Sequence, residues 1–202
     1  MSQPRPSPAD VESGESIQGE YSQDERAVLL RLAHDSILAA LENREVSLEP
    51  PTAHLAEPRG AFTSLYLHGG LRGCVGYVLP TSSVYRAVAD TARAAAFEDS
   101  RFYPVTIEEA RDLKIELSIL SPPRAIEAEA VEVGRHGLLI SMHGYRGLLL
   151  PQVPVEHAWD RVTFLEQTCR KAGLPLDAWR KGATIEAFTA EVFGEKQAEL
   201  GY

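Results

Sequence analysis

Apolar residues recur at helical spacing in the first third of the chain, at Leu29, Leu32, Ala33, Ile37 and Leu41. This period predicts an amphipathic helix. Ser22 and Glu25 have the spacing of a capping box, so we expect the helix to begin after Ser22 and to end near Asn43. The same signals predict further helices at 82–97, from Thr106 onward, and from Asp160 to Lys171.

Runs rich in strand-forming residues come in two pairs, each joined by a turn that contains glycine: 60–67 with 71–78, and 137–142 with 146–150. Each pair predicts an antiparallel hairpin. Alternation from Leu113 to Ile119 predicts a half-buried strand, and the segment from Ile185 to Phe193 predicts one more. Helices and strands intermingle without regular βαβ order, so we expect an α+β fold, mainly antiparallel sheet with flanking helices.

Composition divides the chain into a domain and two tails. Residues 1–21 are polar and proline-rich, and we expect them to form a disordered acidic tail. A single domain is expected over residues 22–195, followed by a C-terminal tail at 196–202.

The net charge of −9 argues against a sequence-independent nucleic-acid binder, which would need a basic face. Two cysteines cannot build a disulfide framework or a four-thiolate metal site. The N-terminus lacks the charged and apolar regions of a secretory signal, and no apolar run approaches the roughly 18 residues that cross a bilayer. We therefore expect a cytoplasmic protein with free thiols and no membrane contact.

The segment Gly69–Gly76 holds four glycines in eight residues around Arg72 and Cys74. Glycines weaken a strand unless the backbone approaches another group closely or adopts positive φ. A thiol beside an arginine among exposed amides can be held as the reactive thiolate. The structural alternative is that Cys74 is a small buried side chain and that the glycines shape a bulge.

Cysteine catalysis needs a base within hydrogen-bond reach. None of the six histidines has a diagnostic spacing from Cys74, and His157 lies in a loop, where a binding or a capping role is open. His136 and His143 could meet across a hairpin, but no third ligand is spaced to match, so no metal site is predicted.

Asp99, Arg101 and Glu116 form a second candidate group. Asp99 and Arg101 could form a local ion pair, and an inward Glu116 would need Arg72 or Arg101 as its cation. The two common nucleotide-binding glycine motifs are missing. Gly70–Gly73 has the Gly-x-x-Gly spacing of an RNA-clamping loop, but without the helices that flank it there.

Several segments, taken in order, resemble the AMMECR domain family, whose prokaryotic members are often called AmmeMemoRadiSam system protein A. The segment Leu71–Gly76 reads Leu-Arg-Gly-Cys-Val-Gly, similar to the family's Leu-Arg-Gly-Cys-Ile-Gly hallmark. Further similar segments lie at 95–105, 115–120, 137–138, 150–153, 159–160 and 171–174. The resemblance spans residues 24–195, with slight departures at Val75, Ser100 and Ala158.

The resemblance implies an α+β fold of two lobes and names no established reaction or cofactor. It also implies association with a Memo-like protein and a radical S-adenosylmethionine (radical SAM) enzyme. Two hypotheses follow. In the first, the protein is a cysteine-dependent enzyme or enzyme component that modifies a small molecule or an RNA component, with Cys74, Arg72 and Glu116 as catalytic candidates. In the second, it is a non-catalytic adaptor that uses the glycine-rich hairpin. The candidate binding residues are Gly73, Gly76, Asp99, Arg101 and His157.

Overall fold

In the computed structural model, which describes residues 19–195, helix α1 (Gln23–Glu42) begins and ends where the sequence predicts. Ser22 Oγ accepts a hydrogen bond from the Glu25 amide, and the Glu25 carboxylate accepts one from the Ser22 amide. Both bonds satisfy amides that have no partner inside the helix. Asn43 ends α1 in the left-handed conformation, with φ of 53°.

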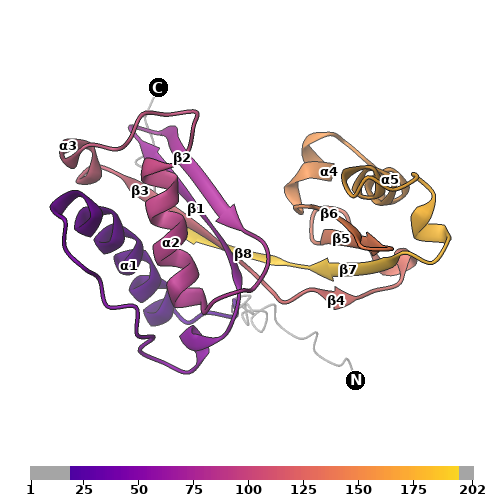
Figure 1. The fold of residues 1–202 in the computed structure, drawn as a ribbon, viewed down its shortest axis with the longest axis horizontal. Coiled ribbons are helices and arrows are strands. Elements are labelled where there is room, and N and C mark those ends of the chain that lie inside the picture. The colour runs from indigo at the N-terminus through magenta and orange to yellow at the C-terminus, as the bar shows by residue number, and fades with distance from the viewer. Residues whose placement is uncertain (1–18, 196–202) are drawn as a thin grey trace, which may run out of the picture.

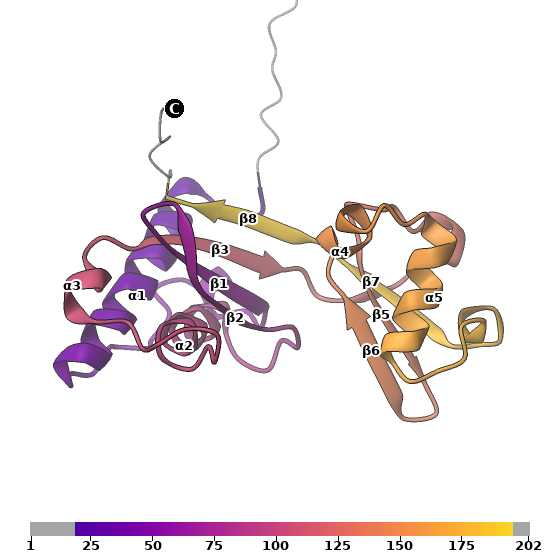
Figure 2. The same cartoon turned by 90° about the horizontal axis from the view of Figure 1, so that it is seen from above.

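The first lobe (residues 19–120 and 190–195) is built on a four-stranded antiparallel sheet of order β2-β1-β3-β8. Its strands are β1 (Gly60–Leu67), β2 (Gly70–Tyr77), β3 (Lys114–Leu120) and β8 (Ala190–Gly194). Its remaining helices are α2 (Val84–Phe97), α3 (Ile107–Ala110) and a 3₁₀ turn at His54–Ala56. Helices α1 and α2 lie together on one side of this sheet (Figures 1 and 2).

Alternation along the strands gives the first sheet two unlike faces. Residues 61, 63 and 65 of β1 and residues 115, 117 and 119 of β3 are fully buried against the helices. The buried hydroxyls of Thr63 and Thr91 hydrogen bond to each other at 2.8 Å, which satisfies both inside the apolar layer. Residues 62, 64, 66, 116 and 118 point to the other face and stay partly exposed.

The second lobe (residues 121–189) has its own antiparallel sheet of order β4-β7-β5-β6. Its strands are β4 (Arg124–Ala125), β5 (Gly137–Met142), β6 (Tyr145–Leu149) and β7 (Thr184–Phe188). Its helices are α4 (Gln152–Glu156), α5 (Arg161–Lys171) and 3₁₀ turns at Ala128–Ala130 and Ala178–Arg180. Helix α5 packs on β5 and β6 around a second apolar core that includes Phe164 and Leu165.

The chain crosses twice between the lobes, from β3 to β4 and from β7 to β8 (Figure 2). The two crossings are tied together, because Ser121 donates its amide to the Thr189 carbonyl and Thr189 donates its amide to Ser121 Oγ, each at 2.9 Å. The prediction of a single strand from Ile185 to Phe193 is therefore wrong. Its two halves pair in different sheets, with Thr189 between them.

Both predicted hairpins are present, and each turns through a His-Gly pair with positive φ: His68 with Gly69, and His143 with Gly144. Two consecutive positive φ values match the right-handed twist of the strands they join. The RNA-clamp interpretation of Gly70–Gly73 does not fit, because these residues lie in strand β2 rather than in a loop. Helix α4 is an element that the sequence does not predict, since the sequence indicates a loop around His157, the residue that ends it.

The predicted α+β class with mainly antiparallel sheet is confirmed. Of the tail predicted at 1–21, residues 1–18 lie outside the described residues, as does the tail predicted at 196–202. Tyr21 is only 2% exposed and stacks on His54 at 4.7 Å, so the packed part of the chain begins before Ser22. No helix in the described part of the chain is long and apolar enough to span a membrane.

We expect Leu117→Ala to lower the free energy of unfolding by about 2–5 kcal/mol, because Leu117 is fully buried between β3 and the helices and its removal leaves a cavity. Leu79→Ala is the matched control: that leucine is 43% exposed, and we expect a loss below about 1 kcal/mol. Denaturant unfolding measures both. Equal losses would contradict the assignment of this face as the core.

Candidate functional site

The thiol of Cys74 lies on the face of the first sheet that the helices leave uncovered. Strand register places Cys74 opposite Ser64 of β1, and Ser64 opposite Glu116 of β3. Side chains in register on neighbouring strands share one face. Ser64 Oγ donates to Cys74 Sγ at 3.4 Å, and Cys74 is partly exposed. The sequence-derived candidates Cys74 and Glu116 are therefore two strands apart in one row.

Tyr66, two residues after Ser64, completes this group, which we name the Cys74 cluster (Ser64, Tyr66, Cys74 and Glu116). The Tyr66 hydroxyl donates to Glu116 Oε1 at 3.5 Å. Burial raises the pKa of Tyr66, and the negative charge of Glu116 raises it further, so the phenol stays protonated and able to donate. The cluster brings a thiol, two hydroxyls and a carboxylate together on three adjacent strands.

The backbone of Cys74 is held by the turn that follows α2. The Cys74 amide donates to Asp99 Oδ2 at 2.9 Å, and Arg101 Nη2 donates to the Cys74 carbonyl at 3.4 Å. Arg101 also binds Asp99 through two nitrogens, at 2.9 and 2.7 Å. These hydrogen bonds from Arg101 hold the pKa of the Asp99 carboxyl well below its usual range. Asp99 and Arg101 thus form the predicted local ion pair and bind the main chain of Cys74.

Arg72 points to a different partner. Its Nε and Nη2 bind the two carboxylate oxygens of Glu109 at 3.1 and 2.9 Å, and its guanidinium lies 5.9 Å from the ring centre of Phe102. This ion pair lowers the pKa of Glu109. The guanidinium charge of Arg72 is therefore already matched by Glu109. The action of Arg72 on the thiol of Cys74 stays a prediction.

Packing explains both glycines of the hallmark segment, Gly73 and Gly76. A Cβ on Gly73 would lie 2.1 Å from the Ala95 carbonyl oxygen of α2. A Cβ on Gly76 would lie 2.1 Å from the ring of Phe62, which covers that position. Both distances are far inside van der Waals contact, so neither site has room for a side chain.

The candidate histidines lie apart from the Cys74 cluster. His157 ends helix α4 in the second lobe and stacks on Trp159 at 4.8 Å. His136 and His143 flank opposite ends of strand β5, about 20 Å apart along an extended chain, so they cannot share a metal ion. His34 binds Glu195 at 3.0 Å on the surface of α1.

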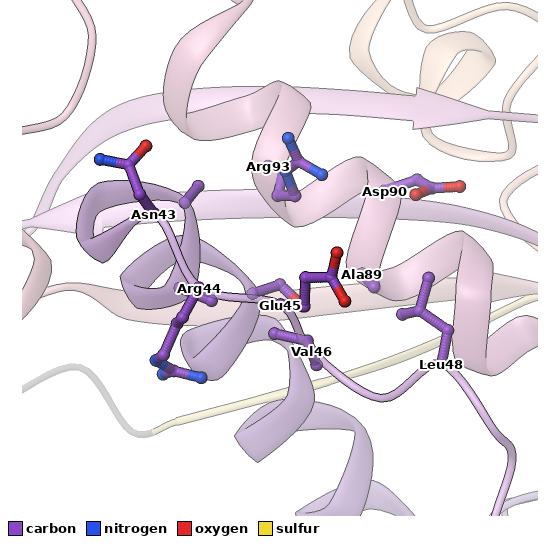
Figure 3. A pocket seen from close by; sticks show the side chains of 11 residues that line it. Asn43, Arg44, Glu45, Val46, Leu48, Ala89, Asp90 and Arg93 are labelled. Carbon is purple, nitrogen blue, oxygen red and sulfur yellow. The ribbon is translucent and has the colours of Figure 1, made fainter.

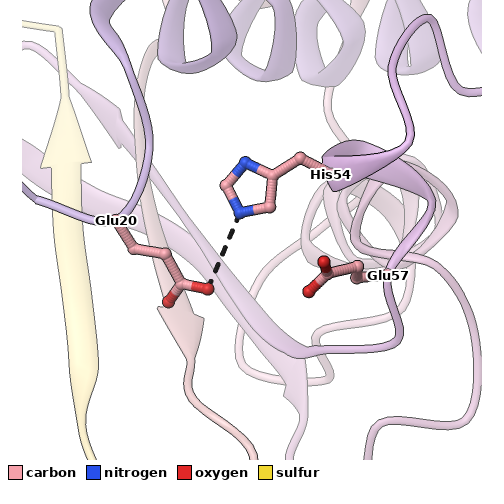
Figure 4. A group of neighbouring side chains, drawn as sticks. All are labelled: Glu20, His54 and Glu57. Carbon is pink, nitrogen blue, oxygen red and sulfur yellow. Dashed lines mark ion pairs between the residues drawn. The ribbon is translucent and has the colours of Figure 1, made fainter.

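Glu20, His54 and Glu57 place three potential metal ligands together beside the start of α1 (Figure 4). His54 Nδ1 hydrogen bonds to Glu25 at 2.8 Å, and its Nε2 lies 3.6 Å from Glu20. Arg59 Nη2 binds the carboxylates of Glu20 and Glu57 at 2.6 and 2.7 Å. The arginine already supplies the cation that these carboxylates need, so the group acts as an ion-pair network that fastens Glu20 and Tyr21.

A cavity of about 500 Å³ lies between α1 and α2 (Figure 3). Alanines at 39, 40 and 89 form part of its wall, and the charged groups of Glu45, Asp90 and Arg93 lie around it. It is on the helical side of the first sheet, away from the Cys74 cluster, and it contains no thiol or histidine.

Sequence reasoning missed Ser64 and Tyr66 as members of the site. Both were interpreted only as strand-forming residues of the segment 60–67. The available signal was their spacing, since residues two apart in a strand share a face. Only the strand register shows which face Ser64 and Tyr66 share and which residues of β2 and β3 lie opposite them.

Comparison with known proteins places the chain among homologous sequences. The AMMECR1 family model matches residues 30–193. A protein of Methanopyrus kandleri is 41% identical over 188 residues, which are 87% of this chain and 91% of the relative. A protein of Thermococcus kodakarensis is 43% identical and covers 83% of this chain and 89% of its own.

The crystal structure of an uncharacterized protein from Pyrococcus horikoshii is similar in fold and sequence. It aligns with a TM-score of 0.66 and 40% identity, over 84% of this chain and 90% of the other. These matches confirm the resemblance that the hallmark segment and the later segments carry.

We expect Gly73→Ala to destabilise the first lobe by about 1–3 kcal/mol, because the added methyl group would overlap the Ala95 carbonyl oxygen. Gly70→Ala, in the same strand, is the control: its Cβ would lie 3.6 Å from the nearest atom, an ordinary contact, and the change should stay within about 1 kcal/mol. Thermal or denaturant unfolding measures both. A stable Gly73→Ala protein would contradict the close approach of α2 to β2.

We expect Asp99→Asn to destabilise the protein at neutral pH and to matter less in acid. The folded-state pKa of Asp99 is lowered, so its stabilisation is complete above the unfolded pKa of about 3.9 and is lost as pH falls below it. The gap in unfolding free energy between wild type and Asp99→Asn should therefore narrow below about pH 4. Asp112→Asn is the control, because Asp112 is exposed and its side chain makes no hydrogen bond to another described residue. A gap independent of pH would contradict the ion-pair assignment.

Proposed function

The chain belongs to the AMMECR1 family, and within that family we propose that it is a cysteine-dependent enzyme or enzyme component that acts through Cys74. The observation that carries the proposal is the position of the thiol. Cys74 lies partly exposed on the uncovered sheet face, next to a hydroxyl donor and in the same row as a carboxylate two strands away. A nucleophilic thiol needs access to a substrate and groups that stabilise the thiolate and accept its proton.

The second cysteine provides the internal contrast. Cys169 of α5 is fully buried in the core of the second lobe, and burial raises the pKa of its thiol. Thiols in such surroundings are chemically inert. Any cysteine chemistry in the described part of the chain therefore falls to Cys74.

Each member of the Cys74 cluster has a role in the proposal. Ser64 donates to the sulfur and would stabilise negative charge on it. Because Glu116 lies two strands from Cys74, it would take up the thiol proton through a bridging hydroxyl or water, with Tyr66 orienting its carboxylate. Arg101, whose side chain is 56% exposed, remains able to bind an anionic substrate group while it holds Asp99.

The family resemblance supports the wider setting of the proposal. We propose that the protein works with a Memo-like protein and a radical SAM enzyme, on a small molecule or an RNA component. Arg72, Gly73 and Gly76 keep their proposed roles beside this site, although packing explains the two glycines without a ligand. His157 keeps its proposed binding role apart from the Cys74 cluster, in the second lobe.

A non-catalytic adaptor is the second candidate, and one observation favours it. Tyr103, two residues after Arg101, is 90% exposed, which is typical of an aromatic contact residue in a protein interface. An adaptor would need Tyr103 and would tolerate loss of the thiol. Bulky substitutions at Gly73 or Gly76 do not test it, because they would disrupt the fold itself.

The test compares Cys74→Ala with Cys169→Ala in a strain that lacks the gene. We expect Cys74→Ala to fold and to fail to rescue the deletion phenotype, and Cys169→Ala to rescue it at the temperature where that variant is folded. In the native wild-type protein, iodoacetamide should modify Cys74 roughly a hundredfold faster than Cys169.

Full rescue by a folded Cys74→Ala protein would exclude the enzymatic proposal. If Tyr103→Ser then failed to rescue and lost binding to the Memo-like or radical SAM protein in a pull-down, the adaptor would take its place.

A further inference from the structure

A cavity of about 650 Å³ lies where the two lobes meet, and we name it the junction cavity. Glu20, Glu57 and Arg59 of the first lobe contribute to its wall, and the second lobe contributes Arg124, Arg135 and His136. The crossing residues Ser121 and Thr189 also line it. Ligand sites occur preferentially at such boundaries between structural units.

On the first-lobe side, two carboxylates share one guanidinium, so this wall carries a net negative charge. The side chain of Arg59 is 10% exposed and binds the carboxylates of both Glu20 and Glu57. A cationic ligand would have to displace this buried guanidinium, which is unfavourable because the arginine would lose both partners. The negative wall formed by Glu20 and Glu57 would repel an anion, so an anionic ligand would have to bind on the second-lobe side.

On the second-lobe side, positive charge is left over. The exposed Arg124 makes no side-chain hydrogen bond or ion pair with another residue of the range 19–195. Arg135 binds Glu132 at 2.9 Å, but both side chains are largely exposed, and such a pair contributes little. His136 accepts the Glu132 amide on Nδ1, so its proton lies on Nε2, which is free to donate.

The cavity also has an apolar wall. Pro122 and Ile126 lie beside Arg124 in the chain, and Phe188 comes from the end of β7. A lining that combines hydrogen-bond donors with carbon suits a ligand with a charged group and an apolar body.

We propose that the junction cavity binds a small organic anion, a carboxylate or a phosphate monoester. Its charged group lies among Arg124, Arg135 and His136, and its apolar part lies against Ile126 and Phe188. Because the cavity is lined from both lobes, the bound anion also stabilises their arrangement. Cys74 takes no part, so the proposal is independent of the enzymatic one.

Titration calorimetry on the full chain tests this, with phenyl phosphate and benzoate as probes and sodium chloride at matched ionic strength as the reference. We expect at least one probe to bind at millimolar concentration, and phenyl phosphate to bind more tightly than inorganic phosphate because its ring contacts the apolar wall. If phenyl phosphate binds more tightly than benzoate, the ligand is a phosphate monoester; if benzoate binds more tightly, it is a carboxylate.

Arg124→Ala should weaken binding about tenfold, and Arg124→Ala/Arg135→Ala should abolish it, since each guanidinium supplies a charge-assisted hydrogen bond. Both arginines are exposed, so the variants keep the wild-type unfolding temperature. Arg146→Ala is the control, because Arg146 is an exposed arginine of β6 that does not line the cavity, and it should bind like wild type. Binding of neither probe, or equal affinity in all four proteins, overturns the proposal.

Discussion

Strand β2 and helix α2 approach so closely at Gly73 that hydrogen is the only side chain that fits. The Ala95 carbonyl oxygen occupies the space that a Cβ would take. With the helix against this side of the strand, the next residue, Cys74, must point to the opposite face. The same contact brings the turn after α2 to the edge of β2, where Asp99 and Arg101 bind the amide and the carbonyl of Cys74. The position of the thiol thus follows from one backbone contact.

The charged side chains around the hallmark segment form separate ion pairs and not a cluster of uncompensated positive charge. Arg72 is matched by Glu109, and Arg101 by Asp99. The two arginines that the sequence places near Cys74 therefore hold the segment after α2 and helix α3 against β2. Groups that touch the sulfur come instead from β1, through Ser64. This favours a chemistry that depends on hydrogen bonding and access more than on a strong positive potential.

The two lobes are separate in their cores and joined in their backbone. Each sheet has its own helices and its own cluster of buried side chains. Ser121 and Thr189 tie the two crossings with a pair of hydrogen bonds, and the junction cavity lies directly beside them. A ligand in that cavity and a substrate on the uncovered sheet face would bind at different parts of the molecule, which gives the architecture room for two distinct recognition events.

The helices and hairpins could be predicted from the sequence because their determinants are local. The capping box of α1, the His-Gly turns and the alternation along β3 are each encoded within a few residues. The hallmark segment likewise singled out Cys74. The division of 185–193 between two sheets could not be predicted, because it depends on Ser121, 68 residues earlier in the chain.

The candidate site, like the fold, could be predicted from the sequence only in part. The sequence by itself determined which residue types were present and, through Cys74 and Glu116, two members of the cluster. Only the tertiary structure decided that Ser64 and Tyr66 join them, that Arg72 turns to Glu109, and that the glycines serve packing. The reason is physical: strand register and the approach of a helix bring together residues that are tens of positions apart, and no local pattern records which of them will meet.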